Sequence, residues 1–198
     1  KSTKVSQKSI MKKEKSPDLL FSLGEYGQAV ELINLNLKSN SDNHELIFLK
    51  GRSQLMLNQY DKSVSTFLDA LAIKMDSDYL NGLGHAYSKL NLINKALAAY
   101  NKSISINNKN SYAYFNAGLL LENGNNKKRA AKYFYSAGTS ALLNKDFIRA
   151  NNALDALQRL SKIKSSIKNK VTKLEKLILE LSDDKDKDFK IIKVNSKG

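Results

Sequence analysis

Hydrophobic residues in the middle of the chain recur at helical spacing, in stripes that come in pairs. Leu80, Leu83 and Tyr87 lie on one face of a predicted helix. A short polar interruption follows at residues 91–94, and a second stripe then runs from Ala96 to Ile104. The pattern predicts two helices joined by a tight turn. Such a hairpin cannot bury its apolar face alone, so it needs neighbours of the same kind.

The same pattern returns about every 34 residues, the period of a helical repeat. Gly51, Gly84 and Gly118 are separated by 33 and 34 residues. A second ladder of small residues has the same period, and each of its members is followed four positions later by a large apolar residue. The ladder is Ala29, Ser63, Ala96 and Ala130, followed by Ile33, Phe67, Tyr100 and Phe134. Small residues at these positions let two helices approach closely, and the large residue fills the space between hairpins.

These residues resemble the tetratricopeptide repeat family. The motifs are Leu80-x2-Leu83-Gly84-x2-Tyr87 with Ala96-x3-Tyr100, and Tyr114-x2-Ala117-Gly118-x2-Leu121 with Ala130-x3-Phe134. They are similar to the family pattern W-x2-L-G-x2-Y and A-x3-F, with Leu80 in place of Trp. The resemblance covers roughly residues 17–143. It implies an all-α fold, a right-handed α-solenoid of stacked antiparallel helix hairpins.

Four segments are expected along the chain. They are a flexible basic tail at residues 1–15, a repeat array at 16–160, a C-terminal capping helix at 161–182 and a charged, loosely ordered tail at 183–198. The array holds a degenerate first copy, three clearer copies and a partial fifth, with the helix around 131–143 serving both the fourth and the fifth. Ser16 and Pro17 are typical of a helix start, which predicts a short first helix ending at Leu23.

Two of these segments leave alternatives open. The stripe of the capping helix, from Ile163 to Leu181, also suits a dimerising coiled coil or a partner-binding helix, although it lasts fewer than three heptads. Within the last tail, residues 189–194 also suit an edge strand. A solenoid needs an end cap with a polar outer side, so the cap is the favoured interpretation.

The chain is strongly basic, with 33 Lys and Arg against 19 Asp and Glu and a net charge of +14. Of the basic residues, 29 are Lys and four are Arg. Arg is the usual reader of phosphates and base edges, so the composition argues against specific nucleic-acid recognition. Residues 1–16 and 161–198 each carry a net charge of +5. Solvated lysines are the favoured interpretation of these ends, and binding of nucleic acid or another anionic surface is the alternative.

Little in the sequence points to catalysis or to a cofactor. The chain has no Cys and only two His, so disulfides, thiolate metal sites and histidine-rich centres are excluded. We therefore expect no catalytic residues, no metal site, no cofactor and no enzyme. Gly82-Leu83-Gly84 lies inside a helical pattern, which indicates helix packing rather than a phosphate loop. The Asp-rich residues 183–188 are interpreted as solvated tail, and residues 124–129 as a turn, with an anion site at the next helix as the alternative.

The resemblance also implies where a partner binds. Tetratricopeptide arrays line a concave groove with the first helices of successive hairpins, and an extended peptide or a partner helix usually occupies it. Carried over to this sequence, the groove residues expected on those helices are Phe48, Arg52, Leu55, Asn81, His85, Lys89, Tyr112, Phe115, Asn116 and Leu119. The aromatic rings would anchor apolar side chains, and the polar groups would bind a peptide backbone or carboxylate. One or two of the rings are expected to serve helix packing instead.

The sequence therefore predicts a non-enzymatic adaptor or scaffold that binds a protein or peptide partner in the groove. Nucleic acid is a less favoured partner, and a monomer is the favoured state. A repeat module of a larger complex or enzyme is a further alternative. No apolar run approaches the ~20 residues of a membrane helix, so no transmembrane segment is expected. A cytoplasmic location is favoured, while residue 1 is Lys rather than Met, which leaves export or membrane anchoring open.

Overall fold

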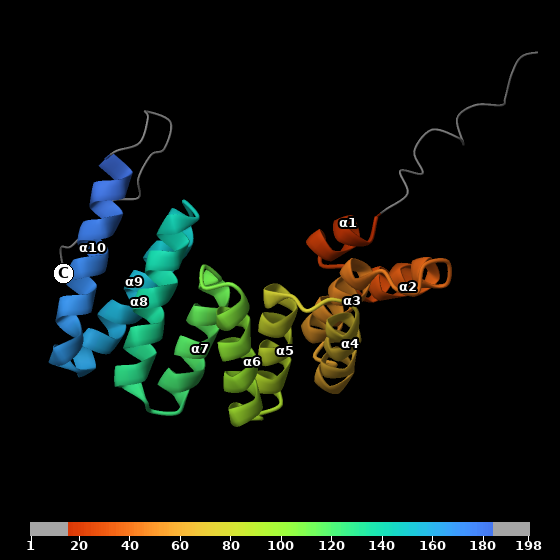
Figure 1. Ribbon diagram of the computed structural model, residues 1–198, viewed down its shortest axis with the longest axis horizontal. Coiled ribbons are helices and arrows are strands. Elements are labelled where there is room, and N and C mark those ends of the chain that lie inside the picture. The colour runs from red at the N-terminus through yellow and green to blue at the C-terminus, as the bar shows by residue number, and fades with distance from the viewer. Residues whose placement is uncertain (1–15, 184–198) are drawn as a thin grey trace, which may run out of the picture. The chain divides into compact units, whose positions relative to one another are not determined.

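The computed structural model describes residues 16–183, and within that range every element is a helix (Figure 1). The elements are α1 (Pro17–Ser22), α2 (Tyr26–Leu37), α3 (His44–Met56), α4 (Tyr60–Ile73), α5 (Ser77–Lys89), α6 (Ile93–Ile106), α7 (Ser111–Asn123), α8 (Lys127–Leu143), α9 (Phe147–Ile163), the 3-10 turn η1 (Ser165–Ile167) and α10 (Lys168–Asp183). The predicted all-α fold class is confirmed.

The chain divides into two compact units, one up to Leu92 and one from Ile93. In the first unit, α1, α2, α3 and α4 each pack against the helix that follows, and α3 also contacts α1 and α5. In the second unit, α7 packs on α6, α8 on α7, and α9 on α8, while α10 packs on both α9 and α8 (Figure 1). Packing of each helix mainly on its neighbours in sequence is the arrangement found in a solenoid of stacked hairpins.

Short polar side chains begin most of these helices. At α1, the hydroxyl of Ser16 accepts a hydrogen bond from the backbone N–H of Leu19 at 3.1 Å, and Pro17 occupies the first turn, as the sequence predicts. The helix ends at Ser22, with Leu23 as its C-cap. The side chains of Asn43, Asn110, Asn126 and Asp146 cap α3, α7, α8 and α9 in the same way.

The turns form a third ladder with the repeat period, which the sequence analysis did not identify. Among residues 16–183, those with left-handed backbone are Gly24 (φ 78°), Asn58 (60°), Asn91 (59°), Asn125 (57°) and Lys145 (58°). The first four are spaced like the glycine ladder, and three of them are Asn, which tolerates this conformation better than other side-chain-bearing residues. The turn residues therefore fix where each second helix begins.

Phe67 of α4 is fully buried in the first unit, where it fills the space between α3 and α5. A Cβ atom added at Gly51 of α3 or at Gly82 of α5 would lie 2.8 Å from the ring of Phe67. Both glycines are therefore required for close helix packing. This confirms the packing interpretation of Gly82, which lies on a helix and not in a phosphate loop.

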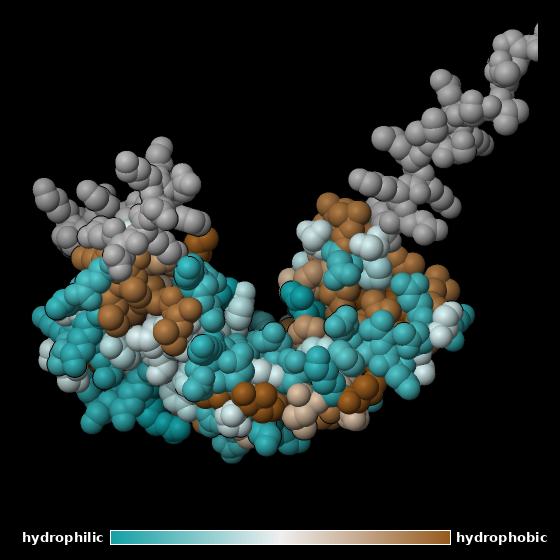
Figure 2. Space-filling model, turned by 45° about the horizontal axis from the view of Figure 1, so that its top comes forward, coloured by the Kyte–Doolittle hydropathy of each residue, from teal (hydrophilic) through white to brown (hydrophobic). Residues whose placement is uncertain are grey.

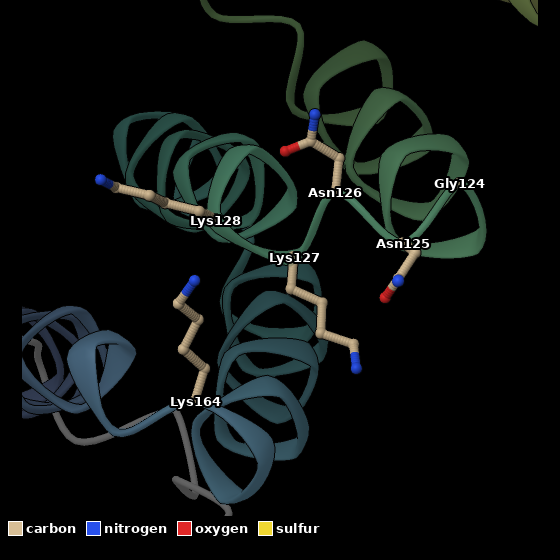
Figure 3. Close-up of a pocket in the computed structure, with 6 residues that line it drawn as sticks. All are labelled: Gly124, Asn125, Asn126, Lys127, Lys128 and Lys164. Atoms are coloured by element: carbon tan, nitrogen blue, oxygen red, sulfur yellow. The ribbon is translucent and has the colours of Figure 1, made fainter.

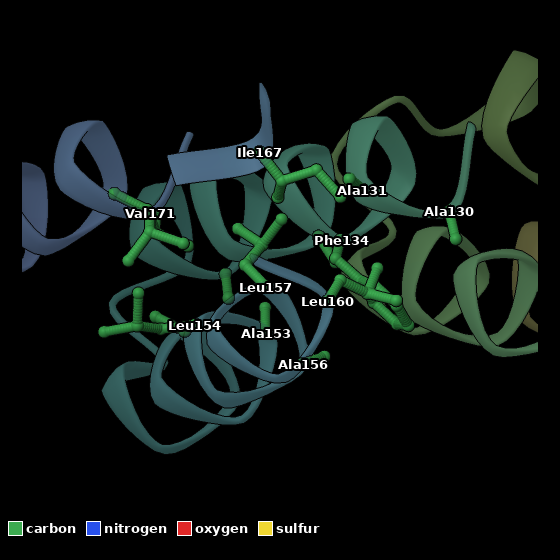
Figure 4. Close-up of a cluster of buried hydrophobic side chains, with 14 of the residues drawn as sticks. Ala130, Ala131, Phe134, Ala153, Leu154, Ala156, Leu157, Leu160, Ile167 and Val171 are labelled. Carbon is green, nitrogen blue, oxygen red and sulfur yellow. The ribbon is translucent and has the colours of Figure 1, made fainter. Parts of the chain in front are cut away.

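The core of the second unit joins α8, α9, η1 and α10 (Figure 4). Its side chains with almost no exposure include Phe134, Leu154, Leu157, Leu160 and Leu174. Helix α8 contacts both α7 and α9. In the earlier hairpins, each glycine of the first ladder is followed twelve residues later by a small residue of the second ladder, and Gly138 and Ala150 repeat this spacing. A Cβ atom at Gly138 would lie 2.5 Å from Leu174, so α10 approaches α8 closely at this point.

The C-terminal helix starts later than expected. Residues 161–182 are predicted as one helix, but α9 continues to Ile163, and α10 begins only at Lys168. Between them Lys164 is extended, with φ −138° and ψ 103°, and Ile167 of η1 turns inward to 2% exposure. The expected tails at 1–15 and 183–198, with the alternative strand at 189–194 and the Asp-rich stretch, lie outside the described residues except for Asp183.

Candidate interaction surface

Phe48 of α3 belongs to an aromatic cluster in the first unit. Its ring stacks on Tyr79 of α5, with centroids 4.4 Å apart, and lies 5.7 Å from the ring of Phe67. The guanidinium of Arg52 lies 4.3 Å from the centre of the Phe21 ring of α1 and 5.7 Å from that of Phe48. The half-buried Phe48 thus packs α3 against α4 and α5, while Arg52 stays exposed above it.

Tyr79 is a member of this cluster that sequence reasoning did not select. Its hydroxyl and Nδ1 of His44 are hydrogen bonded at 2.7 Å. Burial raises the pKa of Tyr79 to about 12, with the nearby carboxylates of Asp76, Glu45 and Asp78 adding to the effect. The phenol therefore keeps its proton at neutral pH and links α3 to α5. In the sequence Tyr79 directly precedes the Leu80 stripe, and this position does not predict its contact with His44.

The other expected residues of the first unit vary in exposure. Leu55, Asn81 and His85 are half-buried, and Lys89 at the end of α5 is exposed. Burial lowers the pKa of His85, and the positive charge of Lys89 lowers it further. The imidazole of His85 is therefore neutral at pH 7, which makes it a hydrogen-bonding group rather than a cation.

In the second unit, Tyr112 at the start of α7 is 52% exposed. The guanidinium carbon of Arg149 in α9 lies 3.5 Å from the centre of its ring, a cation–π contact. Arg149 is itself held by an ion pair with Asp146, the residue that caps α9. The exposed ring is thus fixed by a chain of contacts that ends at a helix cap.

The remaining residues expected on α7 divide between packing and surface. The ring of Phe115 lies 5.3 Å from that of Phe134 and packs against the core. Asn116 is half-buried, and Leu119 is 36% exposed. Phe115 therefore serves packing in the main, whereas Tyr112 and Leu119 present apolar surface to solvent.

A second contact between α7 and α9 also escaped the sequence analysis. The guanidinium of Arg159 donates to both carboxylate oxygens of Glu122, at 3.0 and 2.7 Å. This bidentate pair raises the pKa of Arg159. Nothing in the local sequence links the two residues, because Glu122 lies on α7 and Arg159 lies on α9.

The structure brings the expected residues together in two sets, one on α3 and α5 and the other on α7. Among residues 16–183, no group of three His, Cys, Asp or Glu side chains is placed to hold a metal ion. In the same range, none of the helices is both long and apolar enough to cross a bilayer.

Comparison with known proteins agrees with this architecture. Residues 77–110 match the family model described as Tetratricopeptide repeat. Among solved structures, the crystal structure of MamA aligns with a TM-score of 0.63 at 17% identity, covering 84% of this chain and 94% of MamA. The chain has the tetratricopeptide-repeat fold. No curated protein matches its sequence.

Two further solved tetratricopeptide-repeat structures share the fold. YrrB, described as a TPR protein with an unusual peptide-binding site, aligns with a TM-score of 0.52 at 21% identity, over 84% of this chain and 88% of YrrB. PcrH from Pseudomonas aeruginosa aligns with a TM-score of 0.57 at 22% identity, over 61% of this chain and 92% of PcrH. PcrH has also been crystallised with the chaperone binding region of PopB. The tetratricopeptide fold is thus present beyond the single repeat that the family model matches.

Proposed function

We propose that this tetratricopeptide-repeat protein is a non-enzymatic adaptor that binds an extended segment of a partner protein through the first helices of its hairpins. The observation that carries the proposal is the pair of Tyr112 and Arg149. A large ring is left half in solvent on a first helix, yet an arginine holds it in one place. Rigid aromatic groups and arginines are the residue types that dominate binding energy at protein interfaces.

The chemistry around this pair suits a polypeptide. Leu119 lies seven residues after Tyr112, on the same side of α7, and adds exposed apolar surface. Arg149 keeps a planar cation beside the ring, whose N–H groups can donate hydrogen bonds to a carboxylate or backbone carbonyl oxygen of a partner. In the first unit, the exposed Arg52 and Lys89 and the half-buried His85 offer donors on α3 and α5.

The solved structures lend support by analogy. YrrB is described as having a peptide-binding site, and PcrH was crystallised with a region of PopB. A shared fold alone does not transfer a partner, so the proposal for this chain rests on its own exposed side chains. The alternative that the chain is a repeat module of a larger complex agrees with this proposal, because an adaptor surface works equally well within a longer chain.

The test is a peptide-library selection against the full chain, followed by affinity measurements on individual peptides. Tyr112→Ala combined with Leu119→Ala is expected to weaken the selected peptides at least tenfold, because hot-spot side chains cost over about 1 kcal/mol when truncated. The matched control is Leu143→Ala with Ile148→Ala, which removes two similarly large, exposed side chains at 69% and 74% exposure from the same unit.

The result can contradict the proposal in two ways. If the selection yields no peptide that binds with measurable affinity, the adaptor function is wrong. If the control pair weakens binding as much as the Tyr112 and Leu119 pair, the peptides bind elsewhere. Circular dichroism melting of each variant shows whether the exposed substitutions leave the fold intact.

A further inference from the structure

Two basic segments that are distant in sequence lie together in the second unit. Residues 123–132 and 161–173 contain nine Lys and Arg and not a single Asp or Glu. The first forms the start of α8, and the second runs from the end of α9 through η1 into α10. Because neither segment carries an acidic residue, its charge is not neutralised from within.

These segments surround two adjoining hollows. One, of about 460 Å³, is lined by Gly124, Asn125, Asn126, Lys127, Lys128 and Lys164. The other, of about 180 Å³, shares Lys128 and Lys164 and adds Lys132 and Lys170 among its lining residues. Figure 3 shows Lys127 and Lys128 extending from the start of α8, while Lys164 rises toward them from the end of α9. We call Lys127, Lys128, Lys132, Lys164 and Lys170 the lysine hollow.

Nearby groups leave most of these charges available, while the ammonium of Lys170 lies 5.7 Å from the centre of the Tyr135 ring. Glu122 and Glu175 each lie five residues from the nearest lysine of the hollow. Glu122 is bound in the pair with Arg159, and Glu175 accepts a hydrogen bond from the side-chain amide of Gln158. The Asn126 side chain already accepts from the N–H of Arg129, so it caps α8 and the hollow does not depend on a bare helix end. Lys128, Lys132 and Lys164 are exposed. Clustered like charges raise the energy of the folded chain, and an anion lowers it.

The surroundings of the hollow distinguish between kinds of anionic partner. The large exposed apolar residues of α8, α9 and α10 are mostly at the other ends of these helices, at Leu143, Ile148, Leu179 and Leu181. A helix of this length spans about 25 Å. Of the large exposed apolar residues of these helices, Ile163 is the one that directly adjoins a lining residue, Lys164, in the sequence. Figure 2 shows hydrophobic patches on the surface of this unit alongside hydrophilic regions.

This separation argues against two classes of partner. A bilayer surface is flat, and stable attachment needs apolar insertion besides a polybasic patch, which this end lacks apart from Ile163. A protein partner needs desolvated apolar or aromatic anchors, which are also scarce here. A nucleic-acid backbone needs neither, because it presents one phosphate per nucleotide and a strand can lie between lysines on two sides.

We propose that the lysine hollow binds the phosphate backbone of single-stranded nucleic acid, without reading its sequence. Lysine is a compact, hydrated point charge that neutralises phosphate but does not form the planar fork that reads guanine. The lining residues include no aromatic side chain on which a base could stack. The residues that line the two hollows include neither Tyr112 nor Leu119 of the peptide surface.

The test measures fluorescence anisotropy of a labelled oligo-uridine 20-mer with the full chain from 50 to 200 mM salt. The site variant is Lys128→Gln, Lys132→Gln and Lys164→Gln. The matched control is Lys102→Gln, Lys109→Gln and Lys145→Gln, three exposed lysines of the same unit that leave the same net charge. Each lost phosphate contact removes about 0.7 from the slope of log affinity against log salt, so the site variant is expected to be shallower by about 2.

The control variant and Tyr112→Ala are expected to bind the RNA as the unaltered chain does. The proposal is overturned if the site variant weakens RNA binding no more than the control variant does, since net charge or other lysines would then account for the binding. It is also overturned if the site variant loses binding only to vesicles containing phosphatidylserine, or if poly-glutamate displaces the RNA at equal charge concentration.

Discussion

A Cβ atom at Gly118 would lie 2.7 Å from the ring of Phe134. Gly118 is on α7 and Phe134 is a fully buried residue of α8, so the glycine allows the ring to lie flat against the backbone of the neighbouring helix. The two residues come from the two ladders that repeat every 34 positions. Gly51 and Phe67 make the same contact in the first unit, so the repeat period in the sequence corresponds to a packing contact found in both units.

Gly118→Ala is expected to destabilise the chain by about 1 kcal/mol. Overpacking a close contact costs about 1–3 kcal/mol, and the better helix propensity of Ala returns about 1 kcal/mol of it. Chemical denaturation followed by circular dichroism measures the change. Gly124→Ala is the control, because its nearest atoms would lie 3.6 Å away and the substitution is expected to be neutral or stabilising. Equal effects of the two substitutions would show that the ring does not set the spacing.

Much of the fold could be predicted because it depends on local spacing. The glycine and alanine ladders give the helix pairs, and Ser16 and Pro17 give the start of α1. The late start of α10 could not be predicted, since Ile163 and Ile167 continue the apolar period through the break. Only the burial of Ile167 against α8 and α9, a tertiary effect, explains why the helix stops at Ile163.

The candidate surface was less predictable than the fold. Spacing places Phe48, Tyr112 and Phe115 on first helices, but it cannot say which rings are taken up by packing. The structure shows Phe48 stacked on Tyr79 and Phe115 in tilted contact with Phe134, and leaves Tyr112 exposed. Arg149 was missed because its contact crosses from α9 to α7, beyond the reach of any periodic pattern.

The contact between Tyr112 and Arg149 is expected to stabilise the second unit modestly. A double-mutant cycle with Tyr112→Leu, Arg149→Gln and the combined variant isolates the pair from its neighbours. A coupling of about 0.5–1 kcal/mol is expected, the size of an exposed cation–π contact. The free energy of unfolding of the four proteins gives the value. Additive effects would mean that the arginine does not hold the ring in solution.

His85 is expected to make stability depend on pH. Because burial and then Lys89 lower its pKa, the unfolded chain binds a proton at a pH where the folded chain does not. The free energy of unfolding is therefore not reduced by His85 above pH 6.5, the ordinary pKa, and it falls as the pH drops below that value. Thermal melting between pH 7.5 and 5.5 should show a steeper loss for the unaltered chain than for His85→Gln. Parallel curves for the two proteins would contradict the assignment.

The packing of α10 depends on Leu174, which is fully buried against α8 at Gly138. Leu174→Ala is expected to cost about 2–5 kcal/mol, because it removes a buried side chain and leaves a cavity. Leu179→Ala removes the same atoms from a residue that is 56% exposed on the same helix, and is expected to stay within about 0.5 kcal/mol. Hydrogen exchange of the α10 amides, compared between the two variants, separates loosening of this helix from general unfolding. If both variants leave α10 equally protected, the packing of the helix does not depend on this contact.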